Sequence, residues 1–186
     1  IDEDGDGEVD RYHRGLLNLS ASLDAIQSEF PNPDRVLIVG SSAGAYGTIL
    51  GAMLTRSVYP KVQIDIVADG GVGLGLPGEP WFISYMLDEW GISKFVPESC
   101  EGCFDDGHVT GITTWALDRD KKMSMYAITS TQDFIIADMF LGIGGEAYET
   151  AVRDETEDMA NLHPDQYHRF VFSGSKHTTV SIDSTV

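Results

Sequence analysis

Residues 34–55 read DRVLIVGSSAGAYGTILGAMLT, and this segment is the most informative one in the chain. Residues 35–39 form a short β-branched, apolar run, which is typical of a strand covered on both faces. The small residues after the turn predict a thin helix that packs closely on a sheet. The turn itself matches G-x-S-x-G, with Gly40, Ser42 and Gly44 in the three defined positions. Glycines suit these positions because a nucleophile here sits on strained backbone with no room for a neighbouring Cβ.

The turn also has an ordinary interpretation. A glycine-rich connection between a strand and a helix occurs where a phosphate binds at a helix N-terminus. The strand before Ser42 and the helix after it are the context that a nucleophilic serine requires, so the segment favours a serine hydrolase. Ser41 occupies the variable position and is interpreted as structural.

Length and charge limit the class of protein. The chain has 186 residues, enough for one domain with a real core, and a formal net charge of −18. This charge repels phosphates, so we expect neither nucleic acid nor an anionic membrane as a partner. No apolar run is long enough to predict a membrane span. The acidity suits a protein exposed to salt or divalent cations, although a solvated acidic surface is the simpler explanation and the one we favour.

Strand and helix patterns alternate along the chain and predict an α/β fold with a mainly parallel, doubly wound sheet in a single domain, residues 1–186. Strands are predicted over residues 35–39, 61–68, 123–129 and 167–173, and helices over residues 14–30, 43–56, 110–118, 134–141 and 147–162. Residues 73–109 contain many Gly, Pro and aromatic residues and predict an irregular, cap-like insertion.

A nucleophilic serine needs a base, and the base needs an orienting acid. In open α/β sheets functional residues lie just beyond the C-terminal ends of strands. His177 follows the last predicted strand and Asp133 follows the third, so the catalytic residues are expected to be Ser42, Asp133 and His177. His108 is the best alternative base, and Asp133 has a second interpretation as the cap of the following helix.

These segments resemble the pectin acetylesterase and Notum family of α/β-hydrolases, especially its bacterial members. The resemblance lies in GSSAGAYG at residues 40–47, DGG at 69–71, the region of residues 100–103, STQD at 130–133 and SGSKHT at 173–178. It implies a secreted carboxylic ester hydrolase that needs no cofactor for catalysis and acts on acyl groups carried by saccharides or proteins. It also carries Ser42, Asp133 and His177 across as the triad.

The α/β-hydrolase fold usually places strands and a Gly-rich oxyanion loop before the first helix, and we therefore expect the chain to be a fragment of a longer protein. The backbone N–H of Ala43 is the one oxyanion donor that can be named. Candidates for lining an acyl or sugar site are Trp81, Phe82, Tyr85 and Trp90, which core packing explains equally well.

Two other functions share these features. A thioesterase or acyltransferase uses the same triad, and a calcium-dependent binding module keeps the fold without catalysis. The stretch DEDGDGEVD matches the first nine positions of a calcium loop, with Asp2, Asp4, Asp6, Glu8 and Asp10 as ligands. The twelfth position, normally a bidentate Glu, is a histidine, and a disordered acidic tail is the alternative.

Cys100 and Cys103 form a C-x-x-C pair. A structural zinc needs two further ligands, and a redox motif should open a helix after a strand. We therefore expect a short disulfide within the cap-like insertion, which is in keeping with a secreted protein. Pairing of either cysteine with one outside this chain is the other possibility.

Overall fold

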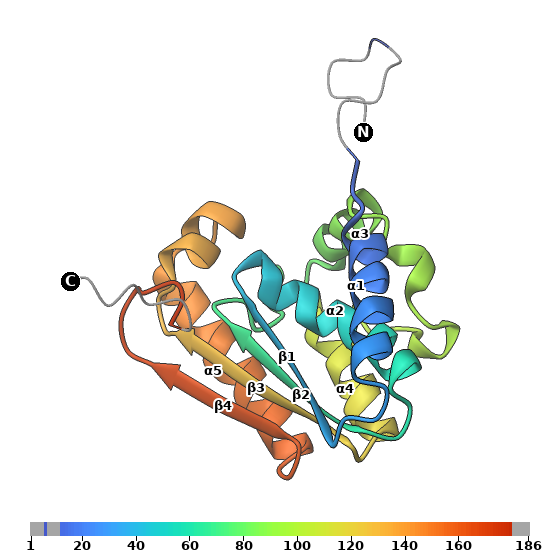
Figure 1. The fold of residues 1–186 in the computed structure, drawn as a ribbon. Helices are drawn as coiled ribbons and strands as arrows, with labels where there is room; N and C mark the ends of the chain where they lie inside the picture. Colours follow the sequence, from blue (N-terminus) through green and yellow to red (C-terminus); the bar gives the residue numbers. More distant parts are fainter. Residues whose placement is uncertain (1–5, 7–11, 180–186) are drawn as a thin grey trace, which may run out of the picture.

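The computed structural model describes residue 6 and residues 12–179. Four strands form one parallel sheet in the order β1-β2-β3-β4 (Figure 1). They are β1 (Arg35–Ser41), β2 (Gln63–Asp69), β3 (Met123–Ser130) and β4 (Tyr167–Phe172). The predicted α/β fold with a parallel sheet is confirmed.

The helices are α1 (Gly15–Glu29), α2 (Ala43–Val58), α3 (Pro80–Glu89), α4 (Thr110–Arg119) and α5 (Gly145–Leu162), with a π-helical turn at Ile135–Phe140 and two short 3-10 turns at Ser93–Phe95 and Glu98–Cys100. The prediction of irregular chain was wrong for α3. Proline at the first helical position is pre-organised for a helix, and Ile83 and Leu87 bury one face at i, i+4 spacing.

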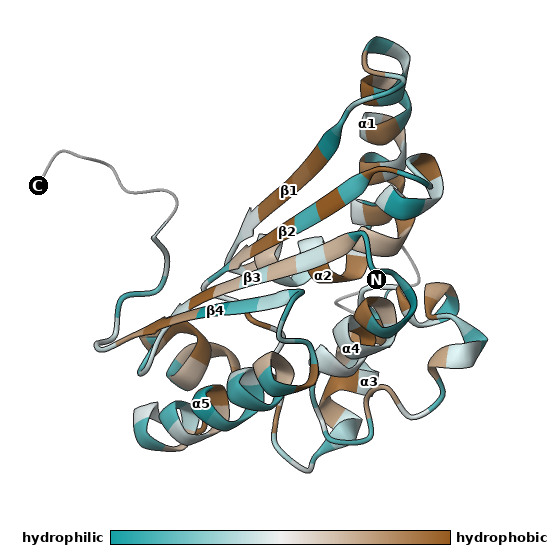
Figure 2. Cartoon of the chain, turned by 90° about the horizontal axis from the view of Figure 1, so that it is seen from below, coloured by the Kyte–Doolittle hydropathy of each residue, from teal (hydrophilic) through white to brown (hydrophobic). Residues whose placement is uncertain are grey.

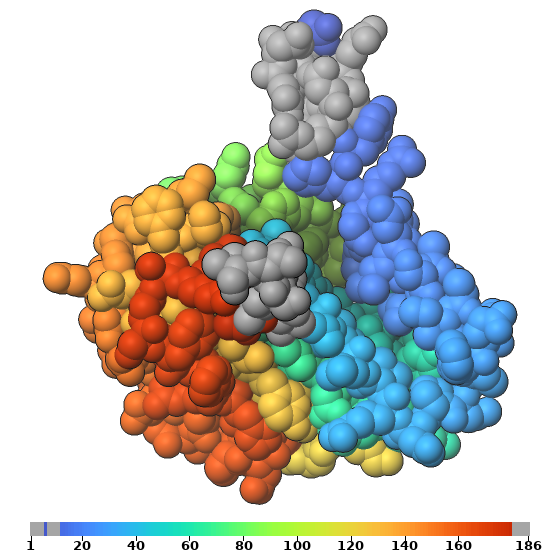
Figure 3. All heavy atoms as spheres, turned by 60° about the vertical axis from the view of Figure 1, so that its left-hand side comes forward, coloured from blue at the N-terminus to red at the C-terminus, as the bar shows by residue number. Residues whose placement is uncertain are grey.

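The helices that pack on the sheet, α2, α4 and α5, lie on one side of it (Figure 2). Each strand leads to its immediate neighbour in the same direction, and right-handed crossovers then place every connecting helix on the same face. Atoms of the four strands reach the surface side by side on the other face, where Leu37, Val39 and Phe170 are 61%, 46% and 63% exposed (Figure 3). Helices on both faces, as a doubly wound sheet requires, are not seen in the part of the chain that the structure describes.

The hydrophobic core fills the space between the sheet and these helices. Alternate residues of the two central strands point into it, among them Ile64 and Ile66 of β2 and Met125 of β3, all at most 2% exposed. Burying each such side chain stabilises the fold by about 1.5–3 kcal/mol. The fully buried Tyr148 of α5 closes the core near β3, where its hydroxyl lies 3.2 Å from the hydroxyl of Thr129.

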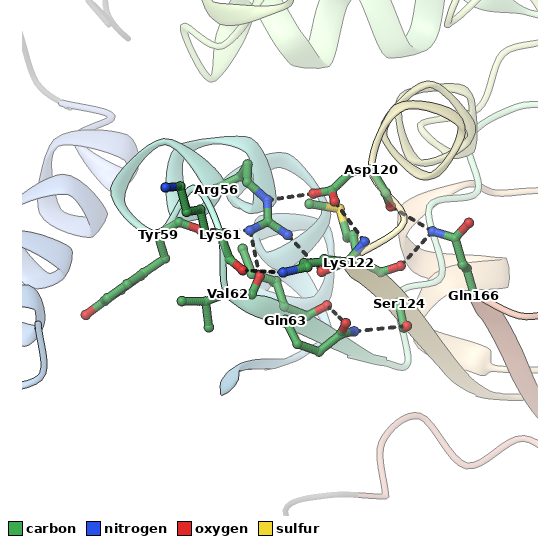
Figure 4. A network of polar contacts seen from close by, with 11 residues as sticks. Arg56, Tyr59, Lys61, Val62, Gln63, Asp120, Lys122, Ser124 and Gln166 are labelled. Atoms are coloured by element: carbon green, nitrogen blue, oxygen red, sulfur yellow. Dashed lines mark hydrogen bonds and ion pairs between the residues drawn. The ribbon is translucent and has the colours of Figure 1, made fainter. Parts of the chain in front are cut away.

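The N-terminal ends of β2 and β3 are tied to α2 by Arg56 (Figure 4). Its Nε lies 2.6 Å from a carboxylate oxygen of Asp120. Its remaining donors contact the backbone carbonyl oxygens of Tyr59, Val62 and Lys122 at 2.8, 2.6 and 2.8 Å. One guanidinium therefore joins three segments at this end of the sheet.

The predicted disulfide between Cys100 and Cys103 is present, with Cα atoms 5.3 Å apart. Cys100 is buried against the core. None of the described helices combines the length and the hydrophobicity that crossing a membrane requires.

Candidate active site

Ser42 occupies the sharp turn between β1 and α2. Its backbone has φ 58° and ψ −125°, and it is the one non-glycine residue with positive φ in the described part of the chain. Such a conformation costs about 1–3 kcal/mol and persists where surrounding contacts enforce it. A Cβ on Gly40 would overlap the carbonyl group of Gly44, so the turn closes only because residue 40 is glycine.

The end of β2 holds this turn in place. The N–H of Ser42 donates to the carbonyl oxygen of Asp69 over 2.8 Å, and the carbonyl oxygen of Ser42 accepts from the N–H of Ala45 over 2.9 Å. A Cβ on Gly71 would lie only 2.6 Å from that same carbonyl oxygen. Ser42 is thus packed directly against the C-terminal end of the second strand.

His177 and Asp133 form a close pair. Nδ1 of His177 lies 2.8 and 2.9 Å from the two carboxylate oxygens of Asp133, which is fully buried. A carboxylate only accepts, so Nδ1 carries the proton and Nε2 presents its lone pair. Oδ1 of Asp133 also accepts the N–H groups of Ile135 and Ile136, each over 3.1 Å. Asp133 therefore holds the histidine and caps the following turn at once.

The second ring nitrogen of His177 lies in an unusual environment. Nε2 is buried and has no hydrogen-bond partner among the described residues. A buried polar atom without a partner costs about 1–3 kcal/mol and calls for an explanation. The bonds of Nδ1 to Asp133 fix the ring, and the unpartnered Nε2 is therefore a candidate proton acceptor.

The loop carrying His177 is fastened to the end of β3. The hydroxyl of Ser130 donates to the carbonyl oxygen of Lys176 over 2.6 Å, and the N–H of Gln132 donates to the carbonyl oxygen of Gly174 over 2.8 Å. A Cβ on Gly70 would overlap the carbonyl oxygen of His177.

His177 and Ser42 therefore pack on adjacent glycines, residues 70 and 71, at the end of β2. Asp133 lies just beyond the end of the neighbouring strand, β3. The three side chains predicted as a triad thus come from turns at one edge of the sheet.

A pocket of about 160 Å³ opens beside Ser42. Its walls are Ser42, Ala43, Tyr46, Trp90, Ile135, Ile136 and Phe140. A second hollow of about 400 Å³ shares Ala43, Tyr46 and Trp90 with it and extends along α1 and α2. The wall nearest the serine is therefore mainly apolar.

Tyr46 lines both hollows with an uncharged side chain. Its hydroxyl donates to the carbonyl oxygen of Leu74 over 2.6 Å. Burial raises the pKa of Tyr46 well above its ordinary value, and Tyr148 and the Asp133 carboxylate add to the rise. The phenol thus stays protonated at neutral pH and keeps charge away from the pocket.

The four aromatic residues predicted to line an acyl or sugar site differ in where they lie. Trp90 lines both hollows, whereas Trp81 and Tyr85 are exposed at 59% and 57%. Phe82 lies behind the pocket wall, with its ring 5.6 Å from that of Phe140. Phe140, on the π-helical turn, had no distinguishing signal in the sequence.

Ala43 is the first residue of α2 and lines the pocket with Ser42. The first four N–H groups of a helix lack partners within the helix and lie at its positive end. The N–H of Ala43 therefore belongs to the positive end of α2, beside the pocket.

The remaining predicted site residues lie elsewhere. Of the proposed calcium ligands, Asp2, Asp4, Glu8 and Asp10 lie outside the described residues. Asp6 is the one ligand of this loop that the structure describes. Residues 6 and 12–179 contain no group of three or more His, Cys, Asp or Glu that could hold a metal ion.

His108, the alternative base, is a buried histidine whose Nδ1 accepts the N–H of Gly75 over 3.0 Å. Its ring therefore has a structural partner, unlike Nε2 of His177.

No protein-family model matches the chain, and no curated protein or solved structure matches it either. The arrangement of Ser42, His177 and Asp133 is therefore the basis for assigning a function.

Proposed function

We propose that this chain is a serine carboxylic ester hydrolase with an α/β-hydrolase-type fold, related to the pectin acetylesterases and Notum. The observation that supports it most directly is the state of His177. Its Nδ1 is bound to the buried carboxylate of Asp133, and its Nε2 is buried without a partner. A strained serine at the same edge of the sheet supplies the nucleophile.

The reaction proceeds by acyl transfer through Ser42. Nε2 of His177 takes the proton from the Ser42 hydroxyl as its oxygen attacks the carbonyl carbon of the ester. Asp133 holds the imidazole in the required tautomer and stabilises the imidazolium that forms. The imidazolium then returns the proton to the leaving alcohol, and the acyl group stays on Ser42.

Water completes the cycle. His177 removes a proton from a water molecule that attacks the acyl-enzyme, and the proton passes to Ser42 as the carboxylic acid leaves. In both steps the negative oxygen is stabilised by the N–H of Ala43, the first residue of α2, which lines the pocket beside Ser42. Loss of one such donor typically lowers turnover by about 10²–10³-fold.

The pocket indicates which part of the substrate lies where. Its apolar wall of Trp90, Ile135 and Phe140 suits the acyl group of the ester. The alcohol side, a saccharide or a protein hydroxyl, then extends toward solvent. The disulfide at Cys100–Cys103 is typical of proteins that work in oxidising compartments, and we place this esterase outside the cytosol on that basis.

Labelling with a fluorophosphonate probe tests the proposal. The parent chain should react at Ser42 and should hydrolyse p-nitrophenyl acetate, whereas Ser42→Ala should do neither and should keep its circular dichroism spectrum. Peptide mapping of the adduct separates Ser42 from the adjacent Ser41. Retained hydrolysis by Ser42→Ala, or an adduct at another residue, would contradict the assignment.

The same experiment separates the competing functions. A folded parent chain that never labels is a binding module without catalysis, and calcium titration then becomes the relevant measurement. A parent that labels but prefers a thioester, or that transfers its acyl group to an added alcohol, is a thioesterase or an acyltransferase.

A further inference from the structure

Asp69 lies between the two halves of the candidate site. It is the last residue of β2 and is fully buried. Its Oδ2 accepts the hydroxyl of Ser41 over 3.2 Å and the N–H of Thr179 over 2.7 Å, while its Oδ1 accepts the hydroxyl of Thr179 over 2.9 Å. Its backbone carbonyl oxygen accepts the N–H of Ser42 over 2.8 Å.

These bonds join segments that are distant in sequence. Ser41 belongs to the nucleophile turn and lies 28 positions before Asp69. Thr179 lies 110 positions after Asp69 and two residues beyond His177. A buried carboxylate is tolerated only where donors surround it, because its desolvation is otherwise costly. The requirement to satisfy Asp69 therefore draws the turn and the histidine loop to one point.

We propose that Asp69 is a positioning residue that sets the placement of His177 relative to Ser42. It acts through its hydrogen bonds to Thr179 and to the nucleophile turn, with no contact to the substrate. The consequence for turnover rests on the proposed function, while the coupling between loop and turn does not. A misplacement of about 1 Å between reacting groups can lower a rate by about 10²-fold.

The chemistry of the side chain distinguishes a geometric role from a role of charge. In Asp69→Asn the amide oxygen accepts from Ser41 and the Thr179 N–H, and the amide NH₂ donates to the Thr179 hydroxyl, which reverses its direction. The three side-chain bonds thus survive in Asn and are lost in Ala, whereas the backbone bond from Ser42 N–H remains in both variants. Thr179→Val removes only the hydroxyl bond and is the mildest change.

A matched control lies on the same strand. Asp65 lies four residues before Asp69 on β2 and is also buried, at 3% exposed. Its carboxylate forms an ion pair with Arg35. Asp65→Ala removes a buried carboxylate from β2 without touching the nucleophile turn. It reports how much of any effect comes from destabilising the strand.

The experiment measures four quantities for the parent, Asp69→Asn, Asp69→Ala, Thr179→Val and Asp65→Ala. They are the rate of fluorophosphonate labelling, kcat and KM for p-nitrophenyl acetate, and the NMR resonance of the His177 Nδ1 proton that is bound to Asp133. We expect Asp69→Ala to lower labelling and kcat by about 10²-fold with KM little changed. Its Nδ1 resonance should broaden or disappear, while Asp69→Asn should stay within about tenfold of the parent.

Three outcomes would overturn the inference. They are an Asp69→Ala chain that labels at the parental rate, an Asp65→Ala chain that is equally impaired, and an Asp69→Asn chain as poor as Asp69→Ala. Should Asp69→Ala not fold, a several-fold loss of labelling in Thr179→Val supports the coupling and an unchanged rate contradicts it.

A parent chain that never labels would refute the proposed function separately. The Nδ1 resonance then decides the coupling alone: its loss in Asp69→Ala supports the inference, and its persistence contradicts it.

Discussion

Replacing Asp133 with asparagine tests how the site works, because it changes the donor pattern at His177 while keeping the shape. In the parent, Oδ1 of Asp133 accepts the N–H groups of Ile135 and Ile136, and the carboxylate also holds Nδ1 of His177. The amide oxygen of asparagine retains the two backbone bonds. Its NH₂ group then faces Nδ1, which must become an acceptor, and the ring proton moves to Nε2.

The magnitude follows from these contacts. A base whose Nε2 already carries a proton cannot take one from Ser42, and the imidazolium loses its carboxylate. In a serine protease triad the same exchange lowers turnover by about 10⁴-fold. We expect a loss of about 10³–10⁴-fold here, which corresponds to about 4–5.5 kcal/mol of activation free energy.

Stability should change much less than activity. Asp133→Asn loses one charge-assisted bond, whereas Asp133→Ala also loses the cap on the π-helical turn, a further ~1 kcal/mol. For a chain of this length that difference lowers the melting temperature by about 2–4 °C.

The assay combines stopped-flow fluorophosphonate labelling with thermal unfolding of the parent and both variants. Asparagine should keep most of the stability and almost none of the reactivity. If Asp133→Asn labels within tenfold of the parent at neutral pH, Asp133 is only a helix cap, and its proposed role in fixing the tautomer of His177 is wrong.

Gly40→Ala should lower the free energy of unfolding by about 1–3 kcal/mol, because its Cβ meets backbone. Gly47→Ala has open space around its Cβ and should raise the free energy of unfolding by about 0.5–1 kcal/mol. Thermal unfolding measures both changes. Arg56→Lys should cost about 2–4 kcal/mol in urea unfolding and leave fluorophosphonate labelling unchanged, since its network lies at the far end of the sheet. Burial lowers the pKa of His163, so the unfolded chain binds more protons below about pH 6.5. Stability should therefore fall as pH drops through that range, and His163→Gln should remove this pH dependence. His168→Gln, at an exposed residue of β4, is the control and should leave it in place. Labelling loss in Arg56→Lys, or identical pH curves for the two histidine variants, would contradict these expectations.

Local sequence patterns predicted the elements and their order. The apolar run at residues 35–39 and the small residues after Gly44 indicated a strand and a helix, and both formed with ends shifted by only a few residues. Strand ends marked Ser42, Asp133 and His177 because parallel strands bring their carboxyl ends to one edge. The helix at Pro80–Glu89 was missed because aromatic and loop-forming residues around it obscured a short i, i+4 pattern.

Periodicity and spacing along the chain predicted the α/β class, the parallel sheet and the C-x-x-C disulfide. They also marked the residue types that could carry acyl transfer. Tertiary structure decided which face of the sheet the helices cover, that Trp90 rather than Trp81 lines the pocket, and that Asp69 joins the Ser41 turn to Thr179. The physical reason is that these features depend on contacts between segments up to 110 residues apart, which only the packing of the whole chain brings together.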